Sequence, residues 1–157
     1  MVHGCWPGHD PSVASWIGAE RNEGVADKVQ STPNSIGYVE LTYAIQHELN
    51  FAAVRNKGGE FIKADLDSLA EAARESEIAG ATPAAINNAP GKYAYPVAAF
   101  TWILLPPESV DPARRAALIE LLRWILTSGQ KECSALGYAP LPRQTADREL
   151  HMLDSQP

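Results

Sequence analysis

The fold depends on one stretch, Ala94-Tyr-Pro-Val-Ala-Ala-Phe-Thr-Trp-Ile-Leu-Leu-Pro106, a continuous apolar run rich in aromatic and β-branched residues. Its length and composition favour a strand that is buried on both faces, as in the middle of an α/β sheet. The sequence before this run has the pattern of short helices and strands, whereas the sequence after it is mainly helical. We therefore expect an α/β protein in which the strand at 94–106 passes from one part of the fold to another.

Composition and charge exclude several classes of protein. The chain has 157 residues, enough for a domain with a real core, and 45% of them are hydrophobic. A net charge of −6 argues against a nucleic-acid-binding protein, which would present a basic face. The longest apolar run is shorter than the roughly 20 residues that cross a bilayer. The segment 1–16, which we expect to be irregular, lacks the basic and apolar regions of a signal peptide.

Local signals predict a helix and a strand in the first third of the chain. Asn22 has the residue type of a helix N-cap, and Val25, Ala26 and Val29 follow on one face of a helix that stops before Thr32-Pro33. Ser35 to Glu40 has the pattern of a short buried strand.

Capping and turn residues predict the remaining elements. Asn56-Lys-Gly-Gly59 has the composition of a hairpin turn, and Asp65 and Asp111-Pro112 have the composition of helix starts. In the helix after Pro112 we expect Leu118, Leu121, Leu122 and Ile125 to face inward. The expected ranges are helices at 41–49, 65–75, 112–128, 130–136 and 143–153, and extended runs at 51–55 and 60–63.

No catalytic or metal-binding constellation is present in the sequence. The serines lack a Gly-x-Ser-x-Gly frame, and no glycine pattern of a nucleotide-binding loop occurs. Cys5 and Cys133 lack the spacing of a metal pair, and the histidines are scattered. We therefore predict no enzyme, no metal and no cofactor. The histidines are His3, His9, His47 and His151.

The helix start at Asn22, Glu23 and Gly24 is the best local candidate for an anion site, because free backbone N–H groups and the helix dipole favour negative charge there. Plain capping is the favoured interpretation, since Glu20 and Glu23 place negative charge nearby. Trp102 and Trp124 are expected in the core. Glu40 is expected to be structural rather than part of a cleft.

Four blocks of sequence together resemble a known family, the substrate-binding proteins of high-affinity phosphate ABC transporters. The most specific parts are Ile36-Gly-Tyr-Val-Glu40 and Leu136-Gly-Tyr-Ala-Pro-Leu-Pro142. Arg21 and Asn34 stand where the family usually has glycine. The blocks are Asn22–Ala26, Thr32–Glu40, Tyr95–Leu104, and a fourth comprising Leu122–Trp124, Gly129-Gln130 and Leu136–Pro142.

The resemblance implies an incomplete two-lobed periplasmic-binding-protein fold of type II, of which this chain matches only the C-terminal half. It implies that 17–93 belong to the second lobe, that 94–106 cross between lobes, and that 107–157 complete the first lobe with helices. The family's phosphate-binding loops, with their Ser-Gly-Thr helix start, have no counterpart here, so no ligand residue is carried over. A shifted reading frame, or a late start codon within a longer gene, would produce this pattern.

The same resemblance implies phosphate as ligand, the membrane subunits of an ABC permease as partners, and a location in the periplasm or on the outer face of the cell membrane. We expect this chain alone to bind phosphate very weakly or not at all. An alternative is a stand-alone interaction or structural module, or a half that complements a separate N-terminal half. A half of a two-lobed protein exposes apolar surface, so we also expect marginal stability or self-association, with 94–106 at an uncovered edge.

Overall fold

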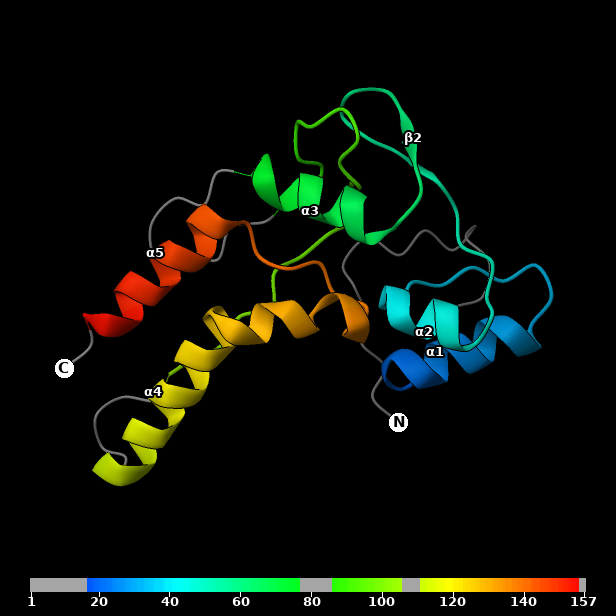
Figure 1. Ribbon diagram of the computed structural model, residues 1–157. Helices are drawn as coiled ribbons and strands as arrows, with labels where there is room; N and C mark the ends of the chain where they lie inside the picture. Colours follow the sequence, from blue (N-terminus) through cyan, green and yellow to red (C-terminus); the bar gives the residue numbers. More distant parts are fainter. Residues whose placement is uncertain (1–16, 77–85, 106–110, 156–157) are drawn as a thin grey trace, which may run out of the picture. The chain divides into compact units, whose positions relative to one another are not determined.

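The computed structural model describes residues 17–76, 86–105 and 111–155 (Figure 1). The chain divides into two compact units, residues 1–50 and residues 51–157, and each is described here by itself. The segment 1–16, predicted to be irregular, lies outside the described residues.

The first unit contains two packed helices, α1 (Arg21–Ser31) and α2 (Leu41–Gln46). Ala26 of α1 is fully buried, which confirms the predicted apolar face of this helix. The chain between the helices crosses that face closely at Gly37. A Cβ atom at Gly37 would lie 2.9 Å from Cγ1 of Val25 and 2.9 Å from Cγ2 of Val29, so the close approach requires glycine.

The predicted buried strand at Ser35–Glu40 is wrong. This segment forms no strand, and the side chains of Ile36 and Tyr38 are 95% and 92% exposed. An extended segment becomes a strand only when a neighbour pairs with its backbone, and no described residue provides that ladder. The helix predicted to follow is confirmed in α2, which ends in a Schellman turn with Glu48 in the left-handed region (φ 52°).

The second unit begins with the predicted hairpin, which is confirmed. Strands β1 (Val54–Arg55) and β2 (Phe61–Ile62) pair antiparallel, with Val54 opposite Ile62, and the turn between them holds Gly59 at φ 89°. Helix α3 (Leu66–Arg74) follows, coloured green in Figure 1. Asp65 caps it as predicted: its carboxylate accepts from the Ser68 N–H at 2.7 Å, and the Ser68 hydroxyl accepts from the Asp65 N–H.

The core of this unit is small and consists largely of alanine. Ala94 is fully buried. Leu69 and Phe100 are partly buried and pack against the cluster. A core without large, fully buried side chains removes little apolar area from water, so it contributes modestly to stability. The buried cluster comprises Ala72, Ala73, Ile86, Ala89, Ala94 and Ala98.

The central prediction, a strand at 94–106 buried on both faces, is wrong for the described part of that run. Residues 94–105 form no strand, and Ile103 and Leu104 are 53% and 88% exposed. Trp102, predicted to be a core residue, is 41% exposed and contacts Phe100 edge to face. Burial on both faces needs strands on either side and layers above and below, and the described residues form only the short β1–β2 ladder.

The helical end of the chain agrees with the prediction in outline. Helix α4 (Pro112–Leu126) starts at the Asp111 cap and packs against α5 (Arg143–Asp154), with Leu122 and Leu153 buried. Leu121 and Trp124, both predicted to face inward, are 52% exposed. The predicted helix at 130–136 is two 3₁₀ turns, Ser128–Glu132 and Ser134–Leu136, which end at Gly137 with φ 82°.

Across the described residues, none of the helices has the length and apolar character needed to cross a membrane.

Candidate functional site

The candidate anion site at the start of α1 differs in detail from the prediction. The helix begins at Arg21, with Glu20 at the N-cap position and no side-chain cap. Asn22, predicted to be the N-cap, lies inside the first turn. Its side-chain oxygen accepts a hydrogen bond at 3.0 Å from the backbone N–H of Glu40, which is the N-cap residue of α2. Asn22 therefore joins the starts of two helices.

Glu23 places its own carboxylate at this helix start. Its pKa is lowered from its ordinary value, first by a hydrogen bond from its own backbone N–H and then by the hydroxyl of Tyr43, which donates to Oε1 at 3.1 Å. The same contact raises the pKa of Tyr43. The carboxylate thus uses the positive end of the helix dipole and one of its free N–H groups.

These contacts favour a structural role for the helix start over a role in anion binding. An added phosphate would meet the Glu23 carboxylate and would find the Asn22 amide oxygen already accepting from Glu40. Gly24 donates its N–H to the Glu20 carbonyl within the helix, at 3.1 Å. The role of these three residues in anion binding stays a prediction.

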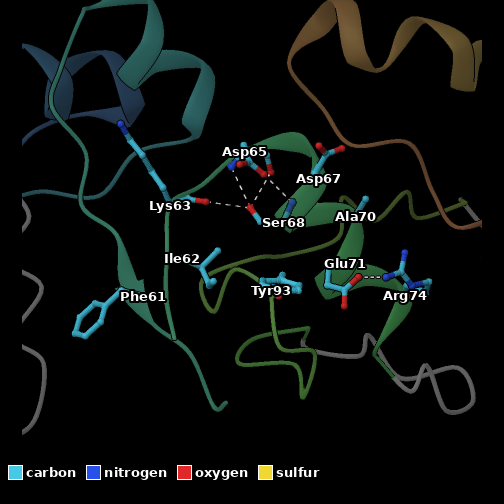
Figure 2. A pocket seen from close by; sticks show the side chains of 10 residues that line it. All are labelled: Phe61, Ile62, Lys63, Asp65, Asp67, Ser68, Ala70, Glu71, Arg74 and Tyr93. Carbon is cyan, nitrogen blue, oxygen red and sulfur yellow. Dashed lines mark hydrogen bonds and ion pairs between the residues drawn. The ribbon is translucent and has the colours of Figure 1, made fainter. Parts of the chain in front are cut away.

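A second location is an open depression of about 590 Å³ between the β2 end and α3 in the second unit. Figure 2 shows Asp65, Ser68 and the Lys63 carbonyl joined by hydrogen bonds at its upper edge, and Glu71 paired with Arg74 at the lower right. The lining residues are Phe61, Ile62, Lys63, Asp65, Asp67, Ser68, Ala70, Glu71, Arg74 and Tyr93.

The charges around this depression do not suit an anion. Three carboxylates, those of Asp65, Asp67 and Glu71, line it beside two cations. The guanidinium of Arg74 pairs with Glu71, and the ammonium of Lys63 lies 4.5 Å from the ring centre of Phe51. Because the cations are already engaged, a phosphate here would face mainly negative charge.

The other predicted functional residues are spread over the structure. Among the described residues, no group of three His, Cys, Asp or Glu side chains could hold a metal ion. His47 lies 3.6 Å from the Asp27 carboxylate. Cys133 is a half-buried free thiol, whereas His3, Cys5 and His9 lie outside the described residues. Glu40, predicted to be structural, is tied by its backbone to Asn22.

Residues of the sequence blocks that carry the family resemblance make hydrogen bonds and close packing contacts between neighbouring elements. Asn22 bonds to Glu40 across the first two blocks, and Gly37 packs on α1. In the last block, Gln130 donates to the Ile125 carbonyl at 2.9 Å and accepts from the Leu141 N–H at 2.8 Å. Glycine at 129 leaves room for the Trp124 ring, which would lie 3.1 Å from an added Cβ. Sequence reasoning missed these side-chain bridges because each joins residues that lie apart in the sequence.

Comparison with known proteins gives clear relatives, although no family model matches the chain. A phosphate-binding protein PstS of Xylella fastidiosa (strain Temecula1) is 37% identical over 139 residues, which is 87% of this chain and 36% of that protein. The PstS protein of Methanocaldococcus jannaschii is 33% identical over 154 residues, covering 90% and 39%. The PstS protein of Pasteurella multocida is 32% identical over 133 residues, covering 83% and 39%.

The predicted resemblance to phosphate-binding proteins is confirmed. This chain spans little more than a third of the length of the PstS proteins that it matches. Each name describes a binding protein, and on that ground the prediction that the chain is not an enzyme is confirmed. The expectation of an α/β fold is confirmed only in its coarse form: the described residues form helices and one two-stranded sheet, and the chain aligns with little more than a third of each longer relative.

Proposed function

We propose that this chain is part of the phosphate-binding component of an ABC-type phosphate importer. One observation carries the proposal: proteins named for phosphate binding, from three different organisms, align with most of this sequence at 32–37% identity. The larger protein is a two-lobed periplasmic-binding protein of type II, located in the periplasm or on the outer face of the membrane. It delivers phosphate to the membrane subunits of the permease.

Within that larger protein we assign residues 17–93 to the second lobe, 94–106 to the crossing between lobes and 107–157 to the completion of the first lobe. The exposed side chains at 101–104, near the end of this run, support a role for the segment in a larger structure. Its side chains Ile103 and Leu104 contact little in the described residues, yet they have the composition of buried strands.

By itself this chain binds phosphate very weakly or not at all. The start of α1 is occupied by the Glu23 carboxylate, and the depression beside α3 is lined mainly by carboxylates. Isothermal titration of the chain with inorganic phosphate tests this expectation. Micromolar affinity would contradict it, and chemical-shift changes confined to Asn22, Glu23 and Gly24 would identify the helix start as the site.

Phosphate titration of the Glu23→Gln variant distinguishes a weak anion site from a helix start that has only a structural role. If the helix start is an anion site weakened by its own carboxylate, removing the charge strengthens phosphate binding, since the carboxylate and the phosphate repel each other at close range. A helix start that only folds the chain shows no binding in either form. Glu132→Gln on the 3₁₀ turn removes one charge elsewhere and serves as the matched control.

A second candidate function is a complementing half, which would associate with a separately made N-terminal half or with a permease. The large fraction of each relative that this chain does not match supports it. Mixing the chain with the unmatched part of the Xylella fastidiosa protein tests the idea by phosphate titration. Restored affinity supports complementation, whereas titration with no heat of binding argues against it.

A further inference from the structure

We draw no further inference here: the strongest candidate, the open depression between β2 and α3 with its three carboxylates at Asp65, Asp67 and Glu71, carries nothing because an acidic cluster alone does not make a site and no other feature of residues 17–76, 86–105 and 111–155 points to a ligand there.

Discussion

The side-chain amide of Asn56 donates a hydrogen bond to the carbonyl oxygen of Ala94 at 3.1 Å, across 38 positions of sequence. The same nitrogen donates to the Lys92 carbonyl at 2.8 Å, and the amide oxygen accepts from the Glu60 N–H at 3.1 Å. Asn56 is only 5% exposed. One side chain thus fixes the hairpin turn to the segment that enters the apolar run, because buried carbonyl groups need donors.

Replacing Asn56 by alanine should lower the free energy of unfolding by about 2–4 kcal/mol, because several hydrogen bonds are lost and their buried partners are left unsatisfied. Asn56→Asp should cost at least as much, since a carboxylate would face the carbonyl oxygens of Lys92 and Ala94. Urea unfolding measures both. Asn87→Ala changes an exposed asparagine in the same unit and should be nearly neutral. Equal midpoints for the alanine variants at 56 and 87 would contradict the role of Asn56.

Two positions where the resembled family usually has glycine have positive φ in this chain. Arg21 has φ 57° and Asn34 has φ 61°. A left-handed conformation costs an ordinary residue about 1–2 kcal/mol, whereas glycine adopts it freely and asparagine tolerates it. The two departures from the family pattern therefore store strain, and more of it lies at Arg21.

Arg21→Gly should stabilise the first unit by about 0.5–1 kcal/mol, since relief of strain outweighs the greater freedom of glycine in the unfolded chain. Asn34→Gly should change stability less. Lys28→Gly is the control in the same helix: Lys28 is exposed and its φ is not positive, so glycine there should destabilise by about 1 kcal/mol. Thermal unfolding followed by helical circular dichroism measures both the gain in stability expected for Arg21→Gly and the loss expected for Lys28→Gly. A loss of stability with Arg21→Gly would refute the strain at that residue.

Elements with short-range signals could be predicted from the sequence. The hairpin followed from Asn56-Lys-Gly-Gly59, and α3 and α4 followed from Asp65 and Asp111-Pro112, because turns and caps are decided by a few neighbouring residues. The two predicted buried strands, at 35–40 and 94–106, could not be decided in this way. Their composition indicates burial, but burial needs partner strands, and none is among the described residues.

The candidate site shows the same division. Free N–H groups at the start of α1 follow from any helix start, and that part could be predicted at Asn22, Glu23 and Gly24. The hydrogen bond from the Glu40 N–H to Asn22 and the contact from Tyr43 to Glu23 join residues 18 and 20 positions apart. Such contacts depend on how α2 packs on α1, which no local pattern of residues determines.

The Tyr43–Glu23 contact predicts how far the pKa of Glu23 rises when each of its neighbours is replaced. Glu23 has a pKa below its ordinary value, with its own backbone N–H as the largest cause and Tyr43 next. Tyr43→Phe should therefore raise the pKa of Glu23, though not fully to the ordinary value of 4.5. His47→Gln should raise it less, since His47 is the smallest contributor. Carbon-13 titration of the Glu23 carboxyl measures these shifts, and a larger effect of His47→Gln would contradict the assignment.

The same lowered pKa gives a sign for pH dependence. A carboxylate whose folded pKa is depressed adds stability above its unfolded pKa, and this contribution is lost as pH falls through the folded value. The Glu23→Gln variant should therefore lose less stability than the unaltered chain between about pH 5 and pH 3, where carboxylates of ordinary pKa become protonated. In that variant the raised pKa of Tyr43 should also fall toward 10.0. Parallel pH profiles of unfolding for the two proteins would count against this coupling.

Gly37 gives the most direct test of how the first unit is packed. An added Cβ would lie 2.9 Å from Val25 and from Val29, closer than carbon atoms approach without one of them moving. Gly37→Ala should therefore lower stability by about 1–3 kcal/mol, as overpacking does. Shortening one neighbour, in Gly37→Ala with Val25→Ala, should recover part of the loss, so the double variant is more stable than the sum of the single effects predicts. Gly18→Ala adds a Cβ with nothing within 4 Å and should be nearly neutral. If the effects of Gly37→Ala and Val25→Ala on the free energy of unfolding were simply additive, the segment 35–40 would not lie against α1 in solution. The exposure of Ile36 and Tyr38 could then not be attributed to this packing.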